Sequence, residues 1–350
     1  MLFVTIALVI GFFFAMNIGA SGTAAAMGAA YGGGAVRKKW LALLLVGVFA
    51  ILGAVTGGGE VVKTISGGFV PAQLVDVEVT IIILVAACLT LFIANVLGIP
   101  LSTSEVTVGA VVGVGVAFKS LYVSHVVLIV AIWLVFPFIA FGMTYLIGKC
   151  VPLIEKKIAA SEKRRQHQKV LVGFVIAAGC YEAFSAGMNN VANAVGPLVS
   201  AGIIDTGTAL WSGALFVALG ALALGGKVLE TNGKKLTKLS LLRACVISLT
   251  SGSLVITASL FGIPVPLVQA TTMSIIAIGT ADRGRSIWQS RTVRQVLKLW
   301  IISPAASLVV SYGLVEAVIF SNYYALVAVL CAVIVPFGFV RLKRGSSNGP

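Results

Sequence analysis

The sequence predicts an all-α membrane protein that crosses the bilayer many times. Of its 350 residues, 59% are hydrophobic and only 10% are charged, against about 25% charged residues in an average soluble domain. The mean hydropathy is +1.08. Most of the charge-free runs reach the roughly 20 residues that a helix needs to cross a bilayer; they cover 1–36, 40–59, 79–104, 120–148, 183–204, 206–226, 244–281 and 317–340. This composition excludes soluble enzymes, secreted domains and nucleic-acid-binding proteins.

Basic residues gather in short segments between the apolar runs, where cytoplasmic loops carry them. The net charge of +14 is therefore assigned to loops at the membrane surface, and no nucleic-acid partner is expected. The five clusters are Arg37–Lys39, Lys149–Lys169, Lys227–Arg243, Arg283–Lys298 and Arg341–Arg344. If all five lie in the cytoplasm, an even number of crossings must separate neighbouring clusters.

The apolar segments satisfy this even count. In order, the predicted crossings are 1–36, 40–56, 79–97, 103–118, 124–148, 170–204, 209–226, 244–261, 266–281, 299–314 and 322–340. The total is about eleven net crossings, including broken or re-entrant helices. The N-terminus is then expected outside and the C-terminus in the cytoplasm, in the plasma membrane of a bacterium, with the lipid bilayer as the surrounding phase.

The two halves of the chain repeat the same short patterns. The matching pairs are 98–100 with 262–264, both Gly-Ile-Pro, then Trp133 and Pro137 with Trp300 and Pro304, and 16–28 with 187–196. Each unit has five crossings, an odd number, so the second copy starts on the opposite side of the membrane. Inverted repeats with interrupted helices are typical of secondary transporters, whose substrate binds near the midplane. The predicted organisation is a first repeat at 1–149, a cytoplasmic linker at 150–169, a second repeat at 170–314, and an extra terminal helix with a cytoplasmic tail at 315–350.

Small and polar residues are predicted to interrupt one helix in each half. The run Leu2–Ala15 would be about 21 Å long as a helix, too short for a hydrocarbon core of about 30 Å. The interrupting residues are Asn17, Gly19, Ser21, Gly22 and Thr23 in the first half, and Gly187, Met188, Asn189, Asn190 and Asn193 between Val170–Ala186 and Val195–Ile203 in the second. Broken backbone at this depth is tolerated where it lines a cavity or is buried in protein. Two half-helix N-termini would then face each other, and their free N–H groups would form an anion site.

A second pair of breaks follows the two Gly-Ile-Pro sequences. Ser102, Thr103 and Ser104, followed by Glu105, are typical of a helix start, because their hydroxyls can cap the helix and donate hydrogen bonds. The matching stretch of the second half has Gln269 in the place of Glu105. Small polar residues in membrane helices also serve close helix packing. Two such clusters at matching repeat positions favour a binding site instead.

These residues resemble the inorganic phosphate transporter (PiT) family. The stretch from Gly187 to Pro197 is similar to its GANDVANA signature, and the stretch from Pro100 to Glu105, with Gly109, is similar to its motif P-x-S-T-T-H-x-x-x-G. The departures are Asn190 and Gly22 at the positions of the family Asp, Ser21 and Ala25 at those of the family Asn residues, and Glu105 and Gln269 at those of the motif His. That pattern is similar to the CysP-type sulfate permeases, a branch of the family.

The departures favour sulfate over phosphate as the substrate. Phosphate near neutral pH carries a proton that a carboxylate can accept, whereas sulfate only accepts hydrogen bonds and is repelled by a carboxylate. Replacement of Asp by Asn and Gly turns an acceptor into a donor or bare backbone N–H. The predicted substrate site consists of Ser21, Gly22, Thr23, Ser102, Thr103, Ser104, Asn189, Asn190 and Asn193.

Accumulation of sulfate requires a coupling cation. Moving a dianion into a negative cell costs about 4.6 kcal/mol per 100 mV. Glu105 and Glu182 are the acids inside long apolar stretches beside the motifs, and ionisable groups at such depth are usually functional. We therefore expect proton coupling through these two residues, with Na⁺ as the alternative ion. The structural alternatives are a Glu105 that only caps its helix and a Glu182 that faces water at the membrane edge.

Other function classes stay open as alternatives. A Na⁺/phosphate symporter would need an acidic cation site, whereas a passive anion channel would need no inverted repeat. A membrane-embedded enzyme would need a nucleophile–base pair or a metal cluster, and the sequence offers no intramembrane set of that kind, so neither enzymatic activity nor a cofactor nor a metal is expected. The family resemblance also admits a homodimer.

Overall fold

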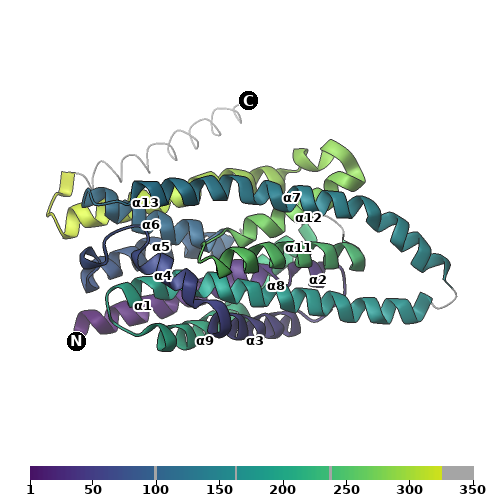
Figure 1. Ribbon diagram of the computed structural model, residues 1–350, viewed down its shortest axis with the longest axis horizontal. Helices are drawn as coiled ribbons and strands as arrows, with labels where there is room; N and C mark the ends of the chain where they lie inside the picture. The colour runs from purple at the N-terminus through teal and green to yellow at the C-terminus, as the bar shows by residue number, and fades with distance from the viewer. Residues whose placement is uncertain (98–100, 162–163, 236–238, 325–350) are drawn as a thin grey trace, which may run out of the picture.

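The computed structural model describes residues 1–97, 101–161, 164–235 and 239–324, and in these residues the structure is helical with no strand. The long helices run side by side along the longest axis of the molecule (Figure 1), and the N-terminus lies at one end of this bundle. The structure confirms the predicted fold class, an all-α membrane protein that crosses the bilayer many times.

The first half begins with a helix that changes its pitch within the bundle. α1 (Leu2–Ile18) continues into a five-residue π-helix, η1 (Gly19–Thr23), and after a turn into the short α2 (Gly28–Gly32). The break predicted at Asn17–Thr23 is therefore wrong: the helix changes from α- to π-helical hydrogen bonding there and ends only at the turn of Ala26 and Met27. The remaining elements of this half are α3 (Lys39–Gly57), α4 (Gly59–Gly67), η2 (Ala72–Leu74), α5 (Val77–Leu97), α6 (Thr103–Ala117) and α7 (Val123–Ala160).

The second half contains a similar series of elements. Its members are α8 (Arg164–Ser200), α9 (Thr206–Leu224), α10 (Gly226–Glu230), η3 (Thr231–Lys235), α11 (Leu241–Leu260), α12 (Leu267–Arg283), η4 (Gly284–Gln289) and α13 (Arg291–Val318). α3 and α9 both have 19 residues, α6 and α12 are both short with 15 and 17 residues, and α7 and α13 both contain an internal proline. These similarities agree with the predicted repeat, although its boundaries stay a prediction.

Within the described residues, eight helices are long and apolar enough to cross a membrane. They are Leu2–Thr23, Lys39–Gly57, Val77–Val96, Val123–Ala160, Arg165–Ser200, Thr206–Leu224, Leu241–Leu260 and Trp300–Val318. α6 and α12 are about 22 and 26 Å long and begin inside the bundle. The last predicted crossing, 322–340, lies almost entirely outside the described residues. The eight full helices and two short ones match ten of the eleven predicted crossings, and the eleventh stays a prediction.

The break predicted between Ala186 and Val195 is wrong, because α8 is one continuous helix from Arg164 to Ser200. Asn and Gly are disfavoured inside helices. An Asn side chain can hydrogen-bond to the nearby backbone in place of the helical bonds, and Gly loses more backbone entropy than other residues when a helix forms. Here the Asn189 amide donates to Ser259 Oγ and to the Ile263 carbonyl on other segments. A Cβ at Gly187 would lie 2.0 Å from the Ala50 carbonyl oxygen of α3, so this glycine is required for close packing of two helices.

Two apolar cores lie on either side of the polar residues. On α8, Ala183 and Ala186 belong to one core and Val191 and Val195 to the other. Along the α1–α2 segment, the core changes in the same way from Ile18 to Ala24. Ser21, Gly22, Thr23, Asn189 and Asn190 lie where the core changes, and Asn193 follows between Val191 and Val195.

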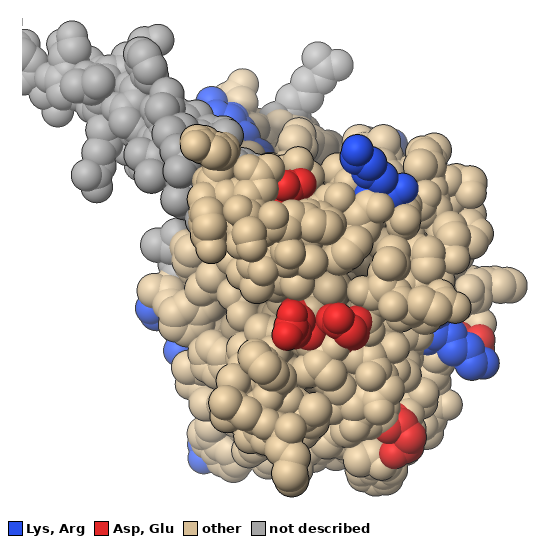
Figure 2. Space-filling model, turned by 90° about the vertical axis from the view of Figure 1, so that its left-hand side faces the viewer, with Lys and Arg blue, Asp and Glu red and all other residues tan. Residues whose placement is uncertain are grey.

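The two ends of the bundle differ in their charges. Figure 2 shows the end at which α1 begins, with acidic residues near its middle and basic residues towards its edges. The opposite end carries the extensions of α7 and α8 (Figure 1), including Lys156, Lys157, Arg165 and Lys169. Residues 150–169, predicted as a linker, are helical up to Ala160 and again from Arg164.

Candidate functional site

The start of α6 places a series of hydroxyl groups inside the bundle. Ser102 is the N-cap of this helix, with an extended backbone, and its Oγ accepts a hydrogen bond from the Glu105 backbone N–H at 3.3 Å. Thr103 and Ser104 follow in the first turn. The N-cap predicted from the sequence is therefore correct. All four side chains are buried, with exposed fractions of 5% or less.

Three asparagines of α8 contact these hydroxyl groups. Thr103 Oγ1 donates to Asn190 Oδ1 at 3.1 Å, and Ser104 Oγ lies 3.2 Å from Asn189 Oδ1. The Asn193 amide donates to both hydroxyl oxygens, at 3.2 Å to Thr103 and 3.1 Å to Ser104. Asn189, Asn190 and Asn193 lie within about one turn of the same helix, so their amides reach one side of it together.

The π-helix η1 completes the cluster. Asn190 Nδ2 donates to Thr23 Oγ1 at 3.4 Å, and Ser21 Oγ donates to the Leu101 carbonyl at 3.1 Å. A Cβ at Gly22 would come within 3.0 Å of Asn190 Nδ2 and 3.4 Å of Thr103 Cγ2. Gly22 thus allows η1 to approach α8 and α6, where a larger residue would displace their side chains.

The nine residues predicted to bind substrate form one buried polar cluster made by η1, α6 and α8. All nine are uncharged, and most donors satisfy acceptors within the cluster or on adjoining backbone. Asn193 Oδ1 is buried without a hydrogen-bond partner among the residues that the structure describes. The cluster is closed to solvent, because its side chains are buried.

One contributor was missed in the sequence. The segment from Ser259 to Val265 supplies a hydroxyl, two carbonyls and a backbone N–H: Ser259 Oγ and the Ile263 carbonyl accept from Asn189, the Val265 carbonyl accepts from Ser104, and the Val265 N–H donates to Asn189 Oδ1. A signal existed, because Ser259 precedes its Gly-Ile-Pro by three residues, as Asn95 does in the first half. Asn95 is also buried, and its amide donates to the Asn17 carbonyl at 2.8 Å.

Glu105 lies at the edge of the cluster and meets its counterpart in the second half. Its Oε1 accepts a hydrogen bond from Gln269 Nε2 at 2.5 Å. Oε2 has no partner in the described part of the chain. The Glu105 side chain therefore does more than cap its helix, since it joins the start of α6 to the start of α12.

Glu182 lies apart from the nine cluster residues, two turns before Asn189 on α8. Its side chain is 0% exposed, so the alternative of a water-facing Glu182 is wrong. Oε1 accepts from Thr271 Oγ1 at 2.5 Å, and Oε2 is unpartnered within the described residues. Farther along α12, Ser274 Oγ lies 2.9 Å from Thr144 Oγ1 and 3.5 Å from Ser251 Oγ. Buried hydroxyls therefore continue from Glu182 along α12.

Among the described residues, no group of three or more His, Cys, Asp or Glu side chains lies close enough together to hold a metal ion. The polar cluster instead consists of neutral hydroxyl and amide groups, whose donors suit an anion that can only accept hydrogen bonds.

Comparison with known proteins gives the family. A sequence model of the phosphate transporter family matches residues 18–311. The chain belongs to the phosphate transporter family. This confirms the resemblance seen in the two motifs, and the match covers η1, α6, α8 and α12 together.

Within the family, relatives are named for different anions. The chain is 51% identical over 338 residues to the sulfate permease CysP of Bacillus subtilis (strain 168), with 97% of this chain and 94% of the relative covered. It is 23% identical to the chloroplastic inorganic phosphate transporter 2-1 of Arabidopsis thaliana, with 85% and 69% covered. A solved structure named the sodium-dependent phosphate transporter has a TM-score of 0.78 and 24% identity, and covers 91% of this chain and all of that one. This last likeness shows the fold.

Proposed function

We propose that the protein is a secondary active transporter that imports an inorganic oxyanion, with sulfate as the substrate and protons as the coupling ion. The observation that carries the proposal is the closed cluster of uncharged donors from η1, α6 and α8. Two comparisons support the proposal: the chain belongs to the phosphate transporter family, and it is 51% identical to a protein named sulfate permease. Transport, without a chemical conversion of the substrate, is the activity proposed.

Sulfate is favoured by the chemistry of Asn190. Its Oδ1 and Nδ2 lie between Thr103 and Thr23, at the position where the family signature has Asp. A carboxylate there would face the oxygens of a bound dianion, and adjacent like charges cost several kcal/mol. An amide can rotate to present its N–H₂ group, and the Thr103, Ser104 and Asn193 donors lie within the same hydrogen-bonded group.

The inverted repeat gives this site a route to both sides of the membrane. Glu105 and Gln269, which match at an offset of 164 residues, come from the starts of two short helices and bond to each other. We propose repeat boundaries at 1–149 and 170–314, with the substrate between the repeats. Rocking of one repeat against the other would then expose the cluster alternately.

Protons are proposed to bind at Glu105 and Glu182. A buried carboxylate without a cationic partner is favoured in its neutral form, and a dianion bound near Glu105 adds to that preference, so proton and sulfate bind together. The hydroxyls of Thr271, Ser274 and Thr144 provide a row of hydrogen-bonding groups from Glu182 along α12. By the positive-inside rule, the end of α12 faces the cytoplasm.

Uptake of labelled sulfate into proteoliposomes tests the proposal. We expect uptake driven by an inward proton gradient, unchanged when Na⁺ is replaced by choline, competed by other aprotic tetrahedral oxyanions and weakly by phosphate. Phosphate uptake at comparable rates that requires Na⁺ would instead support a Na⁺/phosphate symporter, the function for which the structural neighbour is named. Sulfate flux that never exceeds its own electrochemical gradient would indicate a channel.

A further inference from the structure

The longest helices reach beyond the membrane. α7 has 38 residues and α8 has 37, which correspond to about 57 and 55 Å, whereas the hydrocarbon core is about 30 Å thick. Both extend at the same end of the bundle (Figure 1), and a groove lies between the two extensions. This groove is far from the polar cluster, and the transport proposal makes no use of it.

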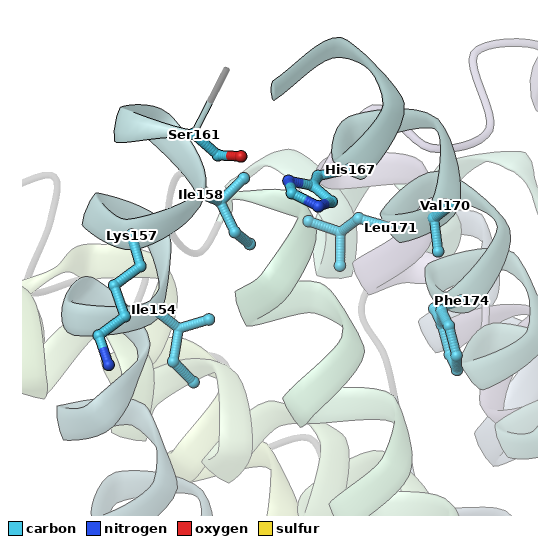
Figure 3. Close-up of a pocket in the computed structure, with 8 residues that line it drawn as sticks. All are labelled: Ile154, Lys157, Ile158, Ser161, His167, Val170, Leu171 and Phe174. Atoms are coloured by element: carbon cyan, nitrogen blue, oxygen red, sulfur yellow. The ribbon is translucent and has the colours of Figure 1, made fainter. Parts of the chain in front are cut away.

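The groove has an apolar wall and a polar end. Its volume is about 440 Å³, and the lining residues are Ile154, Lys157, Ile158, Ser161, His167, Val170, Leu171 and Phe174. Figure 3 shows Ser161 and His167 facing each other across one end, Ile154 and Phe174 on opposite sides towards the other end, and Lys157 at the edge. Phe174 and Val170 are 64% and 54% exposed, so large apolar surfaces stand open in the groove.

The charges around the groove are mainly positive. Lys149, Lys156, Lys157, Arg165 and Lys169 are exposed on the two extensions. The carboxylate of Glu155 on the same stretch of α7 accepts a hydrogen bond from Ser240 Oγ. A ligand in the groove would therefore meet a mainly positive field from the surrounding extensions and hydrocarbon along the wall.

The position of the groove matches the surface of the bilayer. On α8, Lys169 ends the charged stretch and Val170 begins the apolar one, so Val170, Leu171 and Phe174 lie where the membrane begins. Ser161 and His167, nearer the tips of the extensions, lie on the aqueous side. Basic pockets beside membrane helices at this level bind anionic head groups.

We propose that the groove binds one anionic phospholipid, such as phosphatidylglycerol. An acyl chain lies along Ile154, Leu171 and Phe174, and the phosphate lies at the edge of the groove beside Lys157. A free oxyanion accounts for the cations but leaves the apolar wall exposed, whereas a zwitterionic lipid covers the wall but gains little from the positive field. An anionic lipid satisfies both features.

Native mass spectrometry of the purified protein in detergent tests the proposal. Phosphatidylglycerol and phosphatidylcholine with identical acyl chains are titrated separately, and the bound fraction is counted. We expect at least one phosphatidylglycerol to bind about fivefold more tightly than phosphatidylcholine. Lys157→Gln should weaken phosphatidylglycerol binding about fivefold, because one Lys near the surface contributes about 1 kcal/mol.

Lys156→Gln is the matched control, since it removes the same charge from the neighbouring position, which does not line the groove. It should change binding less than twofold. Phe174→Gln, on an exposed side chain, should weaken binding of phosphatidylglycerol while leaving the melting temperature of the lipid-free protein unchanged. Equal binding of the two lipids, or equal effects of Lys156→Gln and Lys157→Gln, would overturn the proposal.

A second arm separates lipid from free anion. Glycerol 1-phosphate and inorganic sulfate are each added in large molar excess to the lipid-bound protein. Retention of the lipid supports the proposal, and its displacement by either soluble anion would show an anion site instead. The lipid count involves no uptake, so failure of the sulfate hypothesis would leave this result intact.

Discussion

Asn190 is the residue on which the choice of anion depends. Its amide contacts Thr103 of α6 and Thr23 of η1, so one side chain joins all three parts of the cluster. We predict that Asn190→Asp weakens sulfate binding at least about tenfold, because the added charge would face the dianion. Isothermal titration with sulfate measures the effect.

The control for this prediction is Ala201→Asp, which adds the same charge just beyond the end of α8. It should leave the sulfate affinity within about twofold of the parent. Normal binding by Asn190→Asp would show that Asn190 does not contact the substrate.

Glu105 is the second residue with a testable role. Its Oε1 accepts from Gln269 and its Oε2 is unpartnered among the described residues, so a proton can be added without breaking the existing bond. We predict that Glu105→Gln abolishes sulfate uptake driven by a pH gradient while sulfate exchange across the membrane continues. Proteoliposome uptake and counterflow measure the two activities separately.

Glu78→Gln serves as the control, since Glu78 is an exposed residue in the first turn of α5. Its uptake should depend on the pH gradient as in the parent. An unchanged gradient response in Glu105→Gln would mean that the coupling proton binds elsewhere.

At the scale of the helices, close packing between neighbours contributes to stability. Two glycines of α8, one at a close contact and one in open space, allow this contribution to be measured. A Cβ at Gly187 would lie 2.0 Å from the Ala50 carbonyl oxygen, whereas a Cβ at Gly173 would meet no atom of the described structure within 4 Å. We predict that Gly187→Ala lowers the unfolding free energy by about 1–3 kcal/mol through overpacking. Gly173→Ala should be neutral or stabilising by up to about 1 kcal/mol. Thermal unfolding in detergent compares the two, and equal melting temperatures would contradict the close packing of α3 and α8.

The start of α9 depends on an acidic cap. Asp205 is the N-cap, and hydrogen bonds from the Thr208 side chain and backbone N–H lower the pKa of its carboxyl below the usual value of 3.8. A lowered folded-state pKa means that the ionised cap stabilises the protein above the unfolded pKa, and that this stability is lost as the pH falls through the folded value. We predict that Asp205→Ala lowers the melting temperature at pH 7 and that the difference disappears at the acid end of the titration. Asp205→Asn, which still caps but does not titrate, should show a smaller pH dependence; an equal dependence in all three proteins would contradict the role of the cap.

Sequence patterns predict helix boundaries well where local preferences and contacts with distant residues favour the same backbone structure. Ser102 was identified as a cap because hydroxyl residues after a proline satisfy the first turn locally. The continuity of α8 was missed because Asn189 and Gly187 disfavour helices locally, whereas their partners, Ser259 and the backbone of Ala50, are distant in sequence. Glu182 was recognised as unusual, but its burial against Thr271 depends on how α8 and α12 pack.

At the scale of the whole molecule, the distribution of charge makes a prediction about orientation. The rule that basic loops face the cytoplasm places the extensions of α7 and α8 inside the cell and α4 outside. In a background with the native cysteines replaced, we predict that Glu60→Cys reacts with a membrane-impermeant maleimide in intact cells. Arg165→Cys should react only after permeabilisation. The reverse labelling would place the whole bundle upside down.

The mutual hydrogen bonds of the polar cluster bear on how the carrier returns when it is empty. Thr103, Ser104, Asn190 and Asn193 are hydrogen-bond partners for one another, so these donors are not left bare in a low-dielectric interior. In the proposed transport cycle, such mutual bonding would lower the free-energy cost of closing the site without substrate, so that the protein could reset for another cycle. Net accumulation requires that return step, whereas an obligate exchanger is built to prevent it.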